Sequence, residues 1–106
     1  LHLYKQTPVD MRVDITAIVK SHPLKTNELK EMLIQLAEAS RKEPACLQYD
    51  LLQSIEEPNV FIFHEIWQDK TGLETHDASA HVLAFRQLSP ELLQEPVLVF
   101  PTNKII

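Results

Sequence analysis

Glycine and cysteine are almost absent from this chain of 106 residues, and each shortage narrows the chemistry that it can perform. The single glycine, Gly72, cannot build the loops that hold dinucleotides or nucleoside triphosphates, because such loops need several glycines. The single cysteine, Cys46, cannot form an internal disulfide, which is typical of a reducing compartment. We therefore expect a cytoplasmic protein without nicotinamide or nucleotide chemistry.

Basic residues and long apolar runs are also scarce. Ten lysines and arginines stand against 15 acidic residues, a formal net charge of −5 that argues against a nucleic-acid or anionic-membrane partner. No apolar run approaches the roughly 18–20 residues that a bilayer span requires. Charged residues near the start interrupt any signal-peptide core, so no signal peptide is expected. The sequence predicts neither a nucleic-acid nor a membrane partner.

The remaining composition is that of one globular domain, with 44% apolar residues. Residues 1–10, LHLYKQTPVD, show no clear period and are expected to be an N-terminal arm, either native or vector-derived. The domain itself is expected over residues 11–106.

Hydrophobic periodicity predicts the order of the elements. Alternation at period two indicates strands, and recurrence at i, i+3, i+4 and i+7 indicates helices. The strands are expected over 13–20, 46–54, 60–68 and 96–100, and the helices over 27–42, over 70–77 and from Asp77 or Ser79 to Phe85. The order βαββαβ predicts an α+β, ferredoxin-like fold with an antiparallel sheet.

The strand over 60–68 also predicts assembly, because both of its faces are largely apolar. One face holds Phe61, Phe63, Glu65 and Trp67, and the other holds Val60, Ile62, His64 and Ile66. The helices of this topology lie on one face, so the other face needs a cover, which a second copy can supply. We expect a homodimer through the open sheet face, with His64 at the interface; the alternative is that the C-terminal tail covers this face.

Two stretches resemble the antibiotic biosynthesis monooxygenase (ABM) domain family. EIWQDKTGLETHDASAH, residues 65–81, is similar to the family pattern of Glu-x-Trp, a short helix, a histidine, four residues and a second histidine. EASRKEPACLQYDLLQS, residues 38–54, resembles its helix end and second strand. The resemblance implies a dimeric α/β barrel of two ferredoxin-like subunits. Members include cofactor-free oxygenases of quinols and anthrones, isomerases of a phosphorylated sugar, and haem-degrading proteins.

The chain departs from the family pattern at several positions. Ala45 stands where the family usually has glycine, and Phe63 stands where anthrone-oxidising members have asparagine. His76 stands where the haem-degrading branch has a tryptophan, and Arg86 lies near the place of its haem-ligating histidine. These differences weigh against the anthrone and haem reactions.

His76 and His81 are the candidate catalytic bases, because an imidazole near a ring hydroxyl can take its proton at neutral pH. The resulting anion can reduce O2 directly in a pocket that excludes water. Glu65 is the third catalytic candidate, expected either to orient a histidine or to bond to a backbone N–H or Arg86. The alternative for each histidine is a position at a helix end, where its charge favours the helix dipole.

Four aromatic residues are candidates for a substrate-binding wall: Tyr49, Phe63, Trp67 and Phe85. Each of them could equally be an ordinary core residue. No metal or other cofactor is expected, because histidines five residues apart diverge by about 140° on a continuous helix.

The sequence thus favours a cofactor-independent monooxygenase acting with O2 on a small quinol or phenol. Two alternatives stay open: an isomerase of a small keto compound that uses the same histidine base, and a non-catalytic dimeric module that binds a small molecule. Oxygenase and isomerase both require enolisation, so the residues do not separate them.

Overall fold

The computed structural model describes residues 11–106, and the expected arm at residues 1–10 lies outside this range. Four antiparallel strands form one sheet in the order β2-β3-β1-β4. The strands are β1 (Val13–Lys20), β2 (Cys46–Gln53), β3 (Val60–Trp67) and β4 (Leu98–Thr102). The helices are η2 (Pro23–Lys25), α2 (Thr26–Arg41), α3 (Lys70–Asp77), α4 (Ala80–Leu88) and η3 (Pro90–Leu92). The predicted α+β, ferredoxin-like fold is confirmed.

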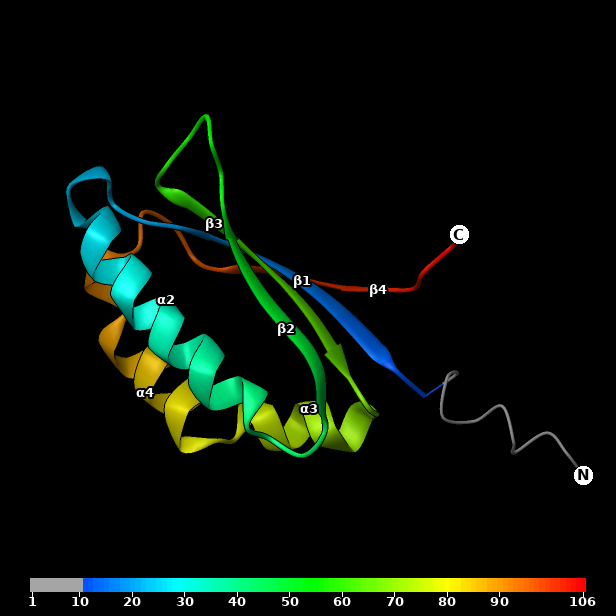
Figure 1. Cartoon of the computed structure of the whole chain (residues 1–106). Coiled ribbons are helices and arrows are strands. Elements are labelled where there is room, and N and C mark those ends of the chain that lie inside the picture. The colour runs from blue at the N-terminus through cyan, green and yellow to red at the C-terminus, as the bar shows by residue number, and fades with distance from the viewer. Residues whose placement is uncertain (1–10) are drawn as a thin grey trace, which may run out of the picture.

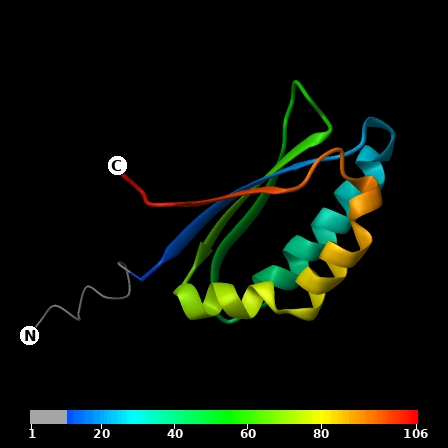
Figure 2. The ribbon, with the colours of Figure 1, turned by 180° about the vertical axis from the view of Figure 1, so that it is seen from behind.

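The helices that the structure describes all lie on one side of the sheet and leave its other face uncovered (Figures 1 and 2). The covered face carries the core, in which Phe61, Phe63 and Trp67 of β3 are buried against Leu29 and Leu33 of α2 and their neighbours. The two faces of β3 therefore separate as its alternation predicts, except at Val60, which belongs to the open-face set and is also buried. None of the described helices has the length and apolar composition needed to cross a bilayer.

The fourth strand begins two residues later than predicted. Pro96 has no backbone N–H, and pairing with β1 starts at Leu98, opposite Ile18. The strand is an edge strand, and its side chains are all exposed in the single chain.

A turn between α3 and α4 gives the two helices different directions (Figure 2). The hydroxyl of Ser79 accepts a hydrogen bond from the backbone N–H of Val82, which caps α4. The same hydroxyl donates to the carbonyl of His76 at 2.6 Å and so ties the end of α3 to the start of α4. The predicted restart at Ser79 is confirmed, and it decides where the late histidines point.

Gly72 allows α3 to approach the start of β2. A Cβ built at Gly72 would lie 2.4 Å from Cβ of Ala45, far inside van der Waals contact. No residue of the described chain has a positive φ, so Ala45 makes the turn before β2 without strain, although it stands where the family that the chain resembles usually has glycine. The room for the Ala45 methyl comes from the missing side chain of Gly72.

We expect Gly72→Ala to lower the free energy of unfolding by about 1–3 kcal/mol, since overpacking outweighs the better helix propensity of alanine. Urea unfolding followed by circular dichroism measures this loss. Ala45→Gly removes the opposing methyl, so adding Gly72→Ala to an Ala45→Gly background should cost much less. Equal costs in the two backgrounds would contradict the contact.

Candidate functional site

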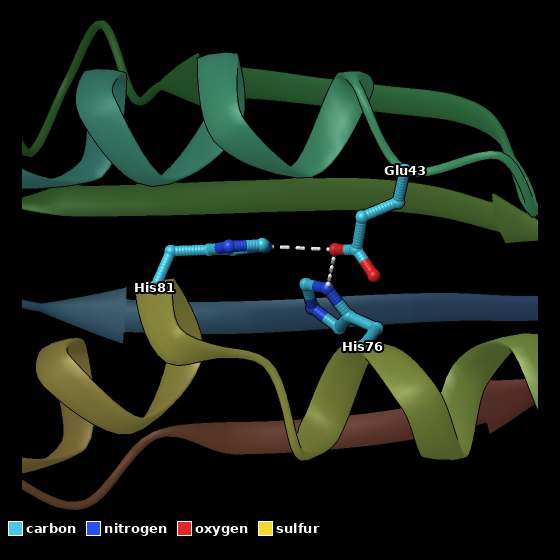
Figure 3. Close-up of side chains that lie close together, drawn as sticks. All are labelled: Glu43, His76 and His81. Carbon is cyan, nitrogen blue, oxygen red and sulfur yellow. Dashed lines mark hydrogen bonds and ion pairs between the residues drawn. The ribbon is translucent and has the colours of Figure 1, made fainter.

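The two late histidines meet at a single carboxylate oxygen (Figure 3). Nδ1 of His76 lies 2.6 Å from Oε2 of Glu43, and Nε2 of His81 lies 2.8 Å from the same oxygen. His76 is in the last turn of α3, His81 is in the first turn of α4, and Glu43 is in the turn between α2 and β2. Two consecutive helices and a distant turn thus build one cluster.

The expectation that the two imidazoles diverge is wrong. It assumes one continuous helix, whereas α3 ends at Asp77 and α4 begins at Ala80 after the Ser79 cap. The turn brings the rings to 5.8 Å between centroids. The spacing argument against a metal therefore fails.

Glu43 was not identified from the sequence as a site residue. It follows the C-terminal end of α2, where the helix dipole disfavours negative charge, so its carboxylate needs another partner. Its side chain is 13% exposed, and among residues 11–106 its ion-pair partners are the two imidazoles, not a lysine or arginine. An acidic residue at a helix C-terminus is a signal in the sequence, but only the fold identifies its partners.

A cavity of about 360 Å³ lies between the helix-covered face of the sheet and helices α3 and α4. Its volume is typical of a site for a small organic ligand. Its apolar wall includes Ile15, Val19, Leu36, Leu73, Val82 and Val99. His76 lies on this wall, whereas His81 lines a separate groove of about 510 Å³ between α2 and α4. The cluster therefore joins an inner cavity to an outer groove.

Three of the four aromatic candidates, Tyr49, Phe63 and Phe85, line the cavity. Trp67 is fully buried and does not line it, but its ring packs against that of His76 with a centroid separation of 4.4 Å and an interplanar angle of 32°. Burial, and secondarily the nearby Glu65 carboxylate, raises the pKa of Tyr49 well above its usual value. The Tyr49 hydroxyl consequently stays protonated and can donate a hydrogen bond.

Glu65 also lines the cavity, but its contacts differ from the expected ones. It accepts a hydrogen bond from Nε1 of Trp67 at 2.9 Å and is bonded neither to a histidine nor to Arg86. Arg86 pairs instead with Asp77, at 3.6 Å. Burial raises the pKa of Glu65 to about 7, with smaller contributions from Asp77 and Glu43, against the opposing effect of the Trp67 bond. The orienting carboxylate of the cluster is therefore Glu43.

The raised pKa of Glu65 predicts that stability falls with pH. The unfolded carboxyl loses its proton near pH 4.5 and the folded one near pH 7, so the contribution is complete below pH 4.5 and is lost as the pH rises through about 7. The expected loss is about 3 kcal/mol. Glu65→Gln stays neutral and keeps an oxygen that can accept from Trp67.

Urea unfolding of both proteins from pH 4.5 to 8 measures this effect. The stability of the glutamine variant relative to the wild type should rise by about 3 kcal/mol across that range. If the free energy of unfolding changed with pH in the same way in both proteins, Glu65 would not be the source of the pH dependence.

Comparison with known proteins assigns the family. Residues 15–88 match the family model described as antibiotic biosynthesis monooxygenase. The chain belongs to the antibiotic biosynthesis monooxygenase family. The resemblance carried by residues 38–54 and 65–81 is thereby confirmed.

Known proteins with similar sequences and structures match most of the chain. "Putative monooxygenase YcnE" of Bacillus subtilis is 33% identical over 89 residues, which cover 84% of this chain and 94% of YcnE. "Putative monooxygenase Rv0793" of Mycobacterium tuberculosis is 30% identical over 87 residues, 82% of this chain and 85% of that one. The crystal structure of PA3566 from Pseudomonas aeruginosa superposes with a TM-score of 0.85 at 30% identity, covering 91% of this chain and 96% of PA3566.

The geometry of this ABM site allows two kinds of chemistry. His76 can act as a base on a molecule in the cavity, because one ring nitrogen is held by Glu43 and the ring lies on the cavity wall. The donor atoms of Glu43, His76 and His81 also lie within 4.8 Å of one another, close enough to be ligands of one metal ion.

Proposed function

We propose that this chain is a cytoplasmic, cofactor-independent monooxygenase that oxidises a small quinol or phenol with O2, and that His76 is its general base. One observation carries the proposal. An imidazole held by a carboxylate lies on the wall of an apolar cavity that is large enough for one small ring. The names of the ABM relatives support the same reaction class.

The hydrogen bond to Glu43 sets the tautomer of His76. A carboxylate accepts the Nδ1–H proton, so the lone pair of the neutral ring is on Nε2. No hydrogen bond from residues 11–106 reaches Nε2, which leaves it free to accept a proton from a ring hydroxyl. Glu43 then stabilises the imidazolium that forms, because the charge pair is nearly buried.

Deprotonation is the step that the protein needs to assist. The phenolate gives one electron to O2, and the substrate radical and superoxide combine at a ring carbon to form a C–O bond. Loss of the hydrogen on that carbon and cleavage of the O–O bond release water, so a hydroquinone and O2 yield a hydroxyquinone and water. The protonated His76 can supply the proton that leaves with the departing oxygen.

The rest of the cavity suits an aromatic anion. Tyr49 stays protonated and can donate to a ring oxygen, and the guanidinium of Arg86, which is paired with Asp77, lies on the same wall. Phe63 and Phe85 offer aromatic surface and exclude water, which protects a peroxide intermediate.

An isomerase of a small keto compound is the second candidate, and Glu65 is the observation that favours it. Enolisation followed by reprotonation at another carbon uses a base and an acid, and a carboxyl with a pKa of about 7 lies on the same cavity as His76. A non-catalytic binding module is the third candidate.

Oxygen consumption separates these candidates. Purified protein is incubated with a panel of hydroquinones and phenols at an oxygen electrode, with the exposed-histidine variant His22→Ala as a control of equal purity. The proposal expects uptake above the autoxidation rate for at least one substrate, with one hydroxyquinone formed per O2. Isomer formation without oxygen loss would support the isomerase, and saturable binding without turnover would support the binding module.

We also propose a homodimer through the open sheet face. The strand register aligns Leu52, Ile62, Ile18 and Leu98 in one row across all four strands of this face. Leu52 and Leu98 are each more than 40% exposed in the single chain, so the row is apolar surface in need of a cover. Sedimentation should give a dimer that Ile62→Glu converts to a monomer; a wild-type monomer at micromolar concentration would overturn this.

A further inference from the structure

The nearly buried carboxylate of Glu43 is bonded to two imidazoles but, within the described chain, lacks the lysine or arginine that normally balances such a charge. Its side chain is 13% exposed, yet no lysine or arginine of residues 11–106 lies within ion-pair distance. Both imidazoles donate to Oε2, and no hydrogen bond from the described chain reaches Oε1. A buried negative charge is costly unless a proton or a cation neutralises it.

The three side chains also offer the right donors for a transition metal. Two imidazoles and one carboxylate form a set that zinc and related ions favour, whereas magnesium and calcium prefer oxygen donors. The donor atoms come from three different elements and all lie within 4.8 Å of one another (Figure 3). We propose that Glu43, His76 and His81 form a binding site for a zinc-class divalent cation, and that this cation disables His76 as a base.

Small side-chain movements convert the hydrogen-bonded cluster into a metal site. The N···O separations are now 2.6 and 2.8 Å, whereas ligands about 2.0–2.1 Å from a tetrahedral ion lie about 3.3 Å apart. The carboxylate must therefore withdraw by roughly half an ångström, or turn so that Oε1 takes part. The two nitrogens, which lie within 4.8 Å of each other, must also approach to about 3.3 Å by rotation of the imidazole side chains. Glu43 lies in a turn, where a glutamate side chain can make this change without moving a helix.

A cation can reach the cluster from the outer groove. The side chain of His81 is 25% exposed and lines the groove between α2 and α4. Glu31 lines the same groove, as does Glu28, which is paired with Lys25 at 3.4 Å, and negative charge along a groove attracts cations. The ion therefore does not need to pass through the apolar cavity on the other side of His76.

Metal binding and base catalysis exclude each other at His76. A metal on Nδ1 takes the lone pair of that nitrogen, so the neutral ring carries its proton on Nε2, which then donates a hydrogen bond and cannot accept a proton. This consequence rests on the proposed function, whereas binding itself does not. Zinc-class ions should therefore inhibit turnover without competing with the substrate.

Calorimetry on chelator-treated full-length protein tests the binding. Zn²⁺ should bind at about one equivalent per chain with release of protons, and Co²⁺ should give visible absorption typical of four-coordination. Mg²⁺ should give neither signal. His81→Ala removes a quarter-exposed ligand with little disturbance and should weaken Zn²⁺ binding at least tenfold, whereas His22→Ala should not.

Circular dichroism of each variant shows whether it is folded, and Glu43→Gln provides a second ligand change. Unchanged Zn²⁺ affinity in folded His81→Ala and Glu43→Gln, or equal loss in His22→Ala, would overturn the site. If Zn²⁺ binds saturably but oxygen uptake is unchanged, the metal site stands and the claim that the metal stops His76 from acting as a base is refuted. Absence of Zn²⁺ binding together with normal oxygen uptake would refute the site and keep the proposed function.

Discussion

Replacing His76 with asparagine should lower kcat for an accepted quinol by about 10²–10⁴-fold, the usual contribution of a general base. Asparagine can still donate a hydrogen bond to Glu43 from the position of Nδ1, but it cannot accept the substrate proton. KM should change little, because the apolar wall of the cavity is retained. Steady-state oxygen uptake at varied substrate concentration measures both constants.

His81→Asn is the matched control for this prediction. His81 bonds to the same carboxylate oxygen but lines the outer groove, so its loss should reduce kcat about tenfold or less. Equal losses in the two variants would mean that the cluster acts as one unit. If His76→Asn kept most of the wild-type rate, the base would have to be sought elsewhere, and Glu65 would be the next candidate on the cavity.

Trp67→Ala should lower the free energy of unfolding by about 3–5 kcal/mol, as expected for deletion of a large buried aromatic ring. Trp67 has no exposed surface, packs on His76 and donates to Glu65. The substitution removes both interactions and the buried ring, and it leaves a buried carboxyl without its donor. A small domain has only about 5–15 kcal/mol of stability, so this variant should be close to unfolding at ambient temperature.

Trp67→Phe separates packing from hydrogen bonding. Phenylalanine fills most of the space but lacks the indole N–H, so a loss of about 1–3 kcal/mol is expected from the unsatisfied Glu65. Circular dichroism must follow the unfolding, since Trp67 is the chain's single tryptophan and both variants lack its fluorescence. Equal losses in the two variants would show that the indole N–H, and not the ring volume, dominates.

Much of the fold could be predicted from local periodicity. The alternation along β3 separated Phe61, Phe63 and Trp67 from Ile62, His64 and Ile66, and the structure buries the first set. That prediction succeeds because side-chain direction in a strand depends on the backbone alone. The Glu-x-Trp pattern and the two later histidines, which belong to the same stretch, also indicated the family before any tertiary contact was known.

The candidate site could be predicted only in part. The cavity wall includes Tyr49, Phe63, Phe85 and Glu65, which were all singled out as candidates. Trp67 lies behind the wall, and the orienting carboxylate is Glu43 and not Glu65. The alternation along a strand predicts which face of the sheet a side chain is on. It does not predict whether a neighbouring side chain separates it from the cavity.

By itself the sequence determined the order of strands and helices, the face of the sheet that is buried, and the family, because these follow from patterns between residues close in the chain. Only the tertiary structure decided that His76 and His81 share one carboxylate oxygen. Glu43 is 33 residues from His76 in the chain, and the Ser79 cap redirects the helix between the histidines. Contacts of this kind depend on how separate elements pack, which no local spacing encodes.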